Sequence, residues 1–200
     1  NVLGTPDSRF SGRERSVDPA NAGKQVRPAG SCGYLHVYTG DGKGKTTAAF
    51  GLAVRALCAG QSVYIGQFVK SMRYNETKIE GIFDRMRIEQ LGRGCFIGHD
   101  PEPADVGMAR EGLARCRALL VSGEYDLVIL DELTIALYYR LLTVDEVLDA
   151  LRARHPSVEV VVTGRYAPQE LVDEADLVTE MREVKHYYTQ GVLSREGIDR

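Results

Sequence analysis

The sequence predicts an α/β fold, in which one domain holds a mostly parallel sheet of about six strands flanked by helices. Short β-branched and aromatic runs alternate with longer helical stretches, as in repeated βα units. A glycine-rich turn joins the first run to a helix, and the fourth run ends in two carboxylates. The length of 200 residues, with 44% hydrophobic and 26% charged residues, suits a single buried core.

The elements follow from this alternation in chain order. Apolar, β-branched or aromatic runs predict strands at Tyr34–Tyr38, Val63–Phe68, Arg87–Gln90, Leu127–Leu130, Val158–Val162 and Leu177–Thr179. The stretches between them predict helices at Thr46–Ala59, Lys78–Asp84, Pro103–Val121, Val144–Arg154 and Pro168–Glu174.

Residues 1–32 are expected to form a flexible N-terminal arm, and residues 33–200 the domain. The arm contains Pro6, Pro19 and Pro28, with several Gly and Ser residues and little apolar periodicity. Two interpretations remain open: a tail without a role, or an arm that orders over a ligand or a partner subunit.

Charge and cysteine spacing exclude several classes. A formal net charge of -3 gives no overall basic field, so no nucleic-acid partner is expected. Cys32, Cys58, Cys95 and Cys116 form no CxxC pair, so neither a zinc ribbon nor a disulfide framework is indicated. No apolar run approaches the roughly 20 residues that cross a bilayer, and the chain does not open on a signal-peptide pattern. We therefore expect a cytoplasmic protein without a membrane partner.

The run TGDGKGKTT, Thr39 to Thr47, lies where a strand passes into a helix. Its three glycines allow unusual backbone angles, so several N–H groups can approach one anion at the helix N-terminus. Lys45 can neutralise phosphate oxygens and the Thr46 hydroxyl can ligate Mg²⁺. The segment therefore predicts a P-loop that binds the triphosphate of a nucleotide, and a P-loop NTPase-like fold.

This loop departs from the usual GxxxxGK[ST] pattern because Thr39 stands where the first glycine is expected. A Rossmann dinucleotide site is a weaker interpretation. Its fingerprint needs no Lys-Thr pair and expects an acidic residue at the end of the second strand, where Val63–Phe68 has none.

The run LVILDE, Leu127 to Glu132, predicts a buried strand that ends in two carboxylates. Ligands of open α/β sheets bind at that edge. Asp131 and Glu132 point in opposite directions on an extended strand, so at most one faces a metal directly. As an alternative, Asp131 caps the segment that follows.

Several blocks together resemble the P-loop type of ATP:corrinoid adenosyltransferase, over about Tyr34 to Asp199. They are VYTGDGKGKTTAA, QFVK (Gln67–Lys70), VILDELTIAL (Val128–Leu137), VVTGRYAP (Val161–Pro168) and ADLVTEMREVKH (Ala175–His186). The TGDGKGKTT form is close to the loop of that family, which accounts for Thr39.

The resemblance implies a transferase that moves the 5′-deoxyadenosyl group of ATP to cobalt of a reduced corrinoid, with triphosphate leaving. Cobalt is then the nucleophile, so no Ser, Cys or His nucleophile is required. The implied nucleotide-binding residues are Gly40, Asp41, Gly42, Lys43, Gly44, Lys45, Thr46, Thr47 and Arg165. Lys45 and Glu132 are the implied catalytic residues, and Thr46 and Glu132 the implied Mg²⁺ contacts.

On the corrinoid side, the resemblance implies an aromatic-rich GxGFTW segment. This chain reads GRGCFI, Gly92 to Ile97, and contains no Trp, so Phe96 and Ile97 are the candidate contacts with the corrin face. As an alternative, Phe96 is an ordinary core residue. The resemblance also implies a homodimer in cobalamin biosynthesis or salvage, and a reductase that supplies electrons to cobalt.

Two other classes share a P-loop. A nucleoside or small-molecule kinase needs a base near an acceptor hydroxyl and usually an arginine-bearing lid, and neither is evident. An ATP-dependent switch or recombinase-like module needs a water-orienting residue and a nucleic-acid surface, and neither is identifiable. The phosphate product formed with and without reduced corrinoid discriminates among the three.

Overall fold

The computed structural model describes residues 32–70, 74–94 and 101–199. In these ranges one six-stranded sheet has the order β3-β2-β4-β5-β1-β6, and all its pairings are parallel. The strands are β1 (Leu35–Thr39), β2 (Val63–Gln67), β3 (Met86–Gln90), β4 (Leu127–Asp131), β5 (Glu159–Thr163) and β6 (Leu177–Glu180). The predicted α/β class and parallel sheet are confirmed.

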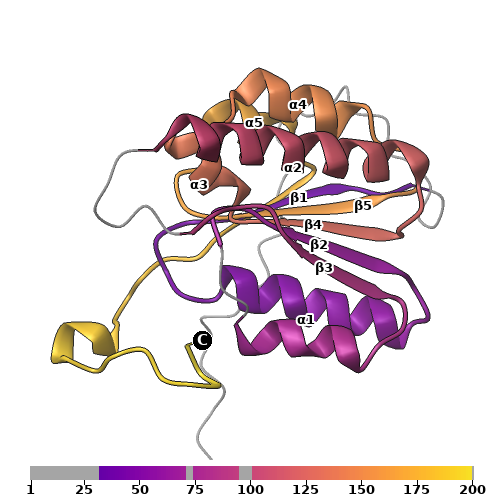
Figure 1. Ribbon diagram of the computed structural model, residues 1–200. Helices are drawn as coiled ribbons and strands as arrows, with labels where there is room; N and C mark the ends of the chain where they lie inside the picture. Colours follow the sequence, from indigo (N-terminus) through magenta and orange to yellow (C-terminus); the bar gives the residue numbers. More distant parts are fainter. Residues whose placement is uncertain (1–31, 71–73, 95–100, 200) are drawn as a thin grey trace, which may run out of the picture.

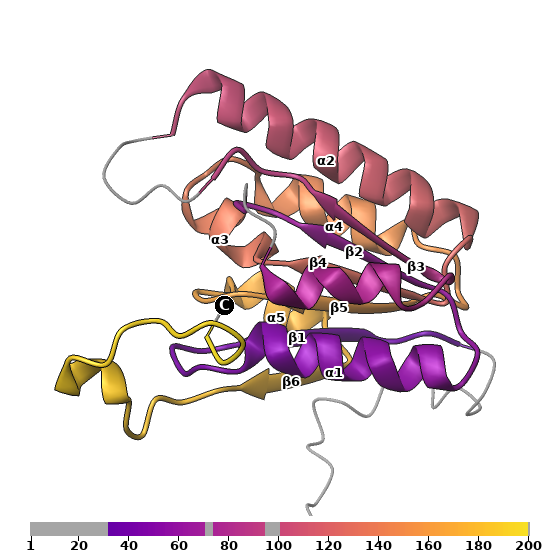
Figure 2. The ribbon, with the colours of Figure 1, turned by 60° about the horizontal axis from the view of Figure 1, so that its bottom comes forward.

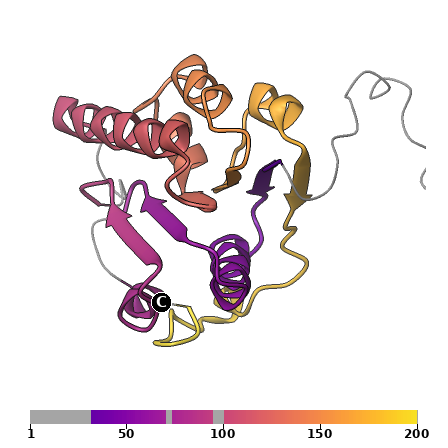
Figure 3. The same ribbon diagram turned by 90° about the vertical axis from the view of Figure 1, so that its right-hand side faces the viewer.

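Helices cover both faces of the sheet, as the two views in Figures 1 and 3 show. α1 packs on one face, and α2, α4 and α5 pack on the other. The helices are α1 (Lys45–Cys58), α2 (Pro103–Ser122), α3 (Leu133–Tyr138), α4 (Val144–Arg152) and α5 (Gln169–Glu174), with 3-10 turns η3 (Asn75–Gly81) and η4 (Tyr187–Gln190).

The core has two layers because side chains alternate across each strand. Val128 and Leu130 of β4 pack with α2 and α4, whereas Leu127 and Ile129 pack with α1. All five residues of β4 are buried. This explains why β4 reads as an unbroken apolar run rather than an alternating one.

One expected helix was wrong in type and position. The prediction placed an α-helix at Lys78–Asp84, but the chain forms the 3-10 turn η3 at Asn75–Gly81. The Thr77 backbone N–H and hydroxyl both donate to the Tyr74 carbonyl, at 3.0 and 2.7 Å. This three-residue spacing favours a tight connector over a longer helix.

The short helix α3 was not predicted, and its start corrects a second expectation. Glu132 occupies the N-cap position with φ 59° and makes no side-chain cap. The alternative in which Asp131 caps this segment is wrong, because its carboxylate contacts other strands and α1 instead. A six-residue helix with an unusual start carries no capping signal in the sequence.

The carboxyl ends of β1, β2, β4 and β5 meet at one edge of the sheet, where the loop Gly40–Gly44 leads into α1. Past β6, residues 181–199 run beside that loop, near the first turn of α1 (Figure 2). The Gly42 N–H donates to the Met181 carbonyl at 2.7 Å. The strand topology therefore places the phosphate loop, the acidic pair and the C-terminal segment together.

Candidate active site

The glycines of the loop are required by its geometry. Gly40 and Gly44 have φ values of 97° and 124°, which side-chain-bearing residues rarely adopt. A Cβ on Gly40 would lie 2.3 Å from the Met181 carbonyl oxygen, and one on Gly42 would lie 2.8 Å from it. Only glycine allows the loop to lie this close to the segment after β6.

Lys45 is buried and turns back into the loop. Its Nζ donates to the carbonyls of Gly40 and Gly42, both at 2.7 Å. Burial lowers the pKa of Lys45, and the nearby positive charge of Arg165 lowers it further. Neighbouring cations disfavour each other's charge, and an anion bound beside both would relieve that repulsion. The pair is suited to a polyphosphate.

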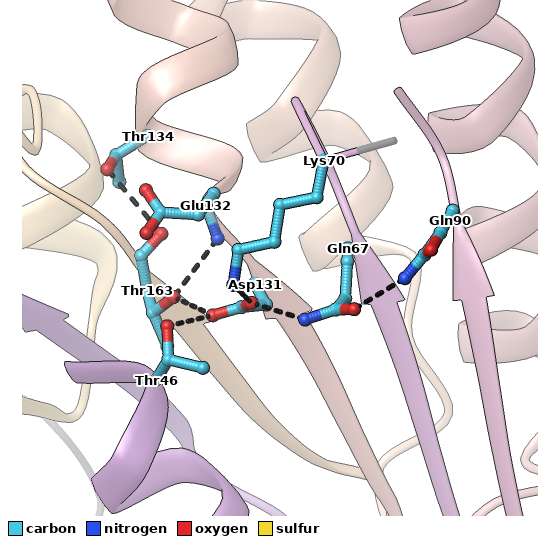
Figure 4. Close-up of polar contacts among 8 residues, drawn as sticks. All are labelled: Thr46, Gln67, Lys70, Gln90, Asp131, Glu132, Thr134 and Thr163. Carbon is cyan, nitrogen blue, oxygen red and sulfur yellow. Dashed lines mark hydrogen bonds and ion pairs between the residues drawn. The ribbon is translucent and has the colours of Figure 1, made fainter. Parts of the chain in front are cut away.

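Asp131 lies at the centre of a polar network at the end of β4 (Figure 4). Its Oδ1 accepts hydrogen bonds from the hydroxyls of Thr46, at 2.8 Å, and Thr163, at 2.7 Å. Its Oδ2 accepts from Gln67 Nε2, at 2.9 Å, and Lys70 Nζ, at 2.7 Å. One carboxylate thus joins the first turn of α1 to three strands.

The charge of Asp131 is stabilised although its side chain is fully buried. Burial acts to raise the pKa of Asp131, but the Lys70 ammonium and the hydrogen bonds from Thr163 and Gln67 outweigh it, so the pKa is lowered. Burial opposes the charge of Lys70 as well, yet Asp131 raises the pKa of Lys70 overall. Both groups are therefore ionised at neutral pH.

Glu132 has a different environment. Burial raises the pKa of its carboxyl, and the neighbouring Asp131 charge raises it further. Its backbone N–H donates to the Thr163 hydroxyl at 3.0 Å, which fixes the left-handed turn after β4. A Cβ built on Gly164 would lie 3.4 Å from Glu132 Oε2, so the loop after β5 packs closely on this carboxylate.

The residues predicted for the site separate into two groups. The structure brings Lys45, Thr46 and Glu132 to one edge of the sheet with Arg165, whose charge acts on both Lys45 and Glu132. Asp41 and Lys43 face the C-terminal segment instead. Asp41 Oδ1 accepts from the Glu183 N–H at 3.2 Å, and Lys43 pairs with Asp199 at 3.0 Å.

The other predicted positions are Thr47 and Phe96. Thr47 is exposed on the first turn of α1. Phe96, a candidate corrin contact, lies outside the described residues, as do Ile97 and the expected arm before Cys32.

Sequence reasoning gave no role to three residues of the network: Gln67, Lys70 and Thr163. Gln67 and Lys70 belong to the QFVK block and Thr163 to the VVTGRYAP block, so the resemblance contained them without a function. The signal that could have found them is position, because polar residues at the carboxyl ends of parallel strands face the ligand edge. Gln67 and Thr163 each end a strand and are fully buried.

The donor set at this edge fits Mg²⁺ better than a transition metal. Among the described residues, no group of three or more His, Cys, Asp or Glu side chains could hold a metal. Mg²⁺ is commonly bound by one or two carboxylates together with substrate phosphates. The Thr46 hydroxyl uses its proton on Asp131, which leaves its lone pairs free to ligate a cation.

Comparison with known proteins agrees with this geometry. The family model described as ATP:corrinoid adenosyltransferase BtuR/CobO/CobP matches residues 31–199. The chain belongs to the ATP:corrinoid adenosyltransferase family. A corrinoid adenosyltransferase of Escherichia coli K12 is 33% identical over 193 residues, which cover 96% of this chain and 98% of the relative. Family membership makes the chain an enzyme of the transferase class.

Other members of the adenosyltransferase family match over most of their length. The corrinoid adenosyltransferase CobA of Salmonella typhimurium LT2 is 33% identical, with coverage of 96% of this chain and 98% of the relative. The Pseudomonas aeruginosa corrinoid adenosyltransferase is 37% identical, with coverage of 84% and 83%. These relatives give no support to the kinase alternative.

A solved structure is similar in fold alone. The flagellar accessory protein FlaH from Methanocaldococcus jannaschii aligns with a TM-score of 0.52 and 13% identity, over 75% of this chain and 71% of that chain. In the described part of the adenosyltransferase chain, no helix has the length and apolar character needed to cross a bilayer.

Proposed function

We propose that this protein transfers the 5′-deoxyadenosyl group of ATP to the cobalt of a reduced corrinoid and releases triphosphate. The observation that supports it most is the joining of the phosphate loop to the acidic strand end, through the Thr46 hydrogen bond to Asp131, in a chain of this family. Nucleotide phosphates and a carboxylate pair then meet at one edge of the sheet.

The reaction balances without a nucleophile from the protein. The electron pair of Co(I) attacks C5′ of ATP, a cobalt–carbon bond forms, and the C5′–oxygen bond breaks. Cobalt is oxidised from Co(I) to Co(III), and the triphosphate leaves with the electron pair of the broken bond. The protein therefore has to place C5′ in line with cobalt and stabilise charge on the leaving group.

Each residue of the proposed site has a part in this. The N–H groups of the loop and Lys45 hold the phosphates, with Arg165 as a second cation beside Lys45. Thr46 and Glu132 are the proposed Mg²⁺ ligands, and Asp131 orients the Thr46 hydroxyl. Mg²⁺ bound there would supply positive charge to the triphosphate. Asp41, Lys43 and Thr47 complete the proposed nucleotide site as loop and helix-turn positions.

The proposal also covers the contact with the corrin, the electron donor, the assembly and the location of the enzyme. Phe96 is the proposed contact with the corrin face, because it is the aromatic residue of the Gly92–Ile97 segment. A reductase that delivers electrons to cobalt, a homodimeric assembly and a cytoplasmic location are also proposed on the strength of the family.

An anaerobic assay tests the reaction. Cob(I)alamin or cob(I)inamide with ATP and Mg²⁺ should give a light-sensitive adenosyl-corrinoid and triphosphate, with little product from the oxidised corrinoid. Stoichiometric release of ADP or orthophosphate, without the spectrum of a cobalt–carbon bond, would reject the proposal in favour of a kinase or an ATPase.

A further inference from the structure

Asp131 has no free acceptor position in this structure. A carboxylate offers two oxygens with roughly four lone-pair sites. Four donors reach Asp131, two on each oxygen: Thr46 and Thr163 on Oδ1, Gln67 and Lys70 on Oδ2. If the function proposed above holds, Mg²⁺ held by Thr46 and Glu132 would bring positive charge beside this carboxylate. One of the four donors would have to give way before Asp131 could accept a further hydrogen bond or interact with the metal.

The four donors differ in their freedom to move. Gln67 and Thr163 belong to central strands and have no exposed surface. Thr46 is fixed in the first turn of α1 and has to stay, since it is a proposed metal ligand. Lys70 reaches Asp131 through a four-carbon side chain, and its side chain is 16% exposed. It is the donor best able to leave.

The backbone before Lys70 is also unusual. Val69 has a φ of 60°, which is a rare conformation for a β-branched residue. Its backbone packs against Gly92, where an added Cβ would lie 2.4 Å from the Val69 nitrogen. Strained positions of this kind are common at switching and ligand-binding sites, because the surrounding structure must hold them in place.

Lys70 supplies the positive charge that this edge requires. Its Nζ lies 2.7 Å from Asp131 Oδ2, and the Glu132 charge acts on it as well. Figure 4 shows the Lys70 side chain descending between Glu132 and Gln67 to reach Asp131. Without a cation, two neighbouring buried carboxylates would repel each other at a high cost in free energy.

We propose that Lys70 is an internal counter-ion of the nucleotide site, which neutralises Asp131 in the metal-free protein and gives up this position when Mg²⁺ and ATP bind. The exchange replaces an ammonium by a divalent cation beside the same carboxylate. Lys70 therefore competes with the metal, and the metal-free site keeps its shape because Lys70 occupies it.

A matched pair of variants tests the competition. Lys70→Met keeps the length of the side chain and removes its charge, whereas Lys78→Met removes an exposed lysine whose Nζ bonds only to Asn75 among the contacts described. The affinity for Mn²⁺, measured by electron paramagnetic resonance with ATP present and corrinoid absent, should rise about tenfold in Lys70→Met. It should stay unchanged in Lys78→Met. Equal or weaker Mn²⁺ binding in Lys70→Met would overturn the proposal.

A second measurement uses the unmodified protein and decides the matter if Lys70→Met fails to fold. In protein labelled with ¹⁵N at lysine Nζ, the ammonium of an ion-paired Lys70 should give a protected NMR signal. Saturation with Mg²⁺ and ATP should remove or shift that signal, and a signal that stays in place would show that the ion pair persists and the proposal is wrong. Because neither experiment contains corrinoid, their failure is distinguishable from a failure of adenosyl transfer.

Discussion

Replacement of Gly40 by alanine tests whether the phosphate loop depends on its contact with the segment after β6. Gly40 has a φ of 97°, and an added Cβ would meet the Met181 carbonyl oxygen at 2.3 Å and its nitrogen at 2.8 Å. Met181 cannot move away freely, because its N–H donates to the Thr39 carbonyl and its carbonyl accepts from the Gly42 N–H. These two hydrogen bonds hold both the phosphate loop and Met181 in place.

Two effects should reduce the stability of Gly40→Ala. A positive φ costs an L-residue about 1–2 kcal/mol, and overpacking against a fixed neighbour costs about 1–3 kcal/mol. Gly40→Ala should therefore lower the free energy of unfolding by about 2–5 kcal/mol. Gly51→Ala is the matched control, because Gly51 lies within α1 and an added Cβ there meets nothing within 4 Å. Gly51→Ala should raise the free energy of unfolding by about 0.5–1 kcal/mol.

Urea unfolding, followed by circular dichroism, measures both changes. With a slope of about 1–3 kcal/mol per M, a loss of about 3 kcal/mol lowers the midpoint by about 1–3 M. Gly51→Ala should shift the midpoint slightly upward. If Gly40→Ala unfolds at the same urea concentration as the wild type, the argument from close packing of the loop is refuted.

Three further predictions concern the site and the assembly. Lys45→Ala should keep the fold and lose about 10²–10³-fold in turnover at saturating ATP, and near-normal turnover would contradict its role. Glu132→Gln should weaken Mg²⁺-dependent turnover more than Asp131→Asn, whereas Asp131→Asn should destabilise the fold more, because it leaves the partly buried Lys70 without its counter-charge. Turnover against Mg²⁺ concentration and urea midpoints for both variants check this order. Light scattering should show a dimer, and full activity of a monomer lacking residues 1–30 would contradict both the dimer and a role for the arm.

The raised pKa of Glu132 predicts a dependence of stability on pH. A carboxyl whose pKa is raised by folding favours the folded state while it is protonated, and that contribution is lost as pH rises through its folded pKa. Ligand-free Glu132→Gln should therefore melt at a higher temperature than the wild type at pH 7. The difference should vanish below about pH 4, where the carboxyl is neutral in both states. A wild type that is the more stable protein at pH 7 would contradict this.

Much of the fold could be predicted because the local signals agree with the tertiary structure. The apolar run that ends at Asp131 became a fully buried central strand, and the glycine loop joined β1 to α1 as expected. The short elements were not predictable in the same way. α3 follows Glu132, whose backbone is left-handed, and η3 begins with hydrogen bonds from Thr77 to the Tyr74 carbonyl, so neither has a periodic pattern.

The site was predictable in its residue types but not in its contacts. The sequence placed a carboxylate pair beside the phosphate loop, yet nothing in it could show that Asp131 contacts Thr46. That contact joins residues 85 positions apart and depends on the strand order, which puts β4 next to β5 and one strand from β1. Gln67, Lys70 and Thr163 enter the network for the same reason, because each lies at or near the end of a strand in this sheet.

Identifying which bond of ATP breaks tests the proposed chemistry most directly. ATP labelled with ¹⁸O at the oxygen between C5′ and the α-phosphate can be incubated anaerobically with cob(I)alamin, Mg²⁺ and the protein, and the products analysed by mass spectrometry. Attack at C5′ predicts that all of the label leaves in triphosphate and that the adenosyl group on cobalt carries none. Label retained in ADP would show cleavage between phosphorus atoms and would contradict adenosyl transfer.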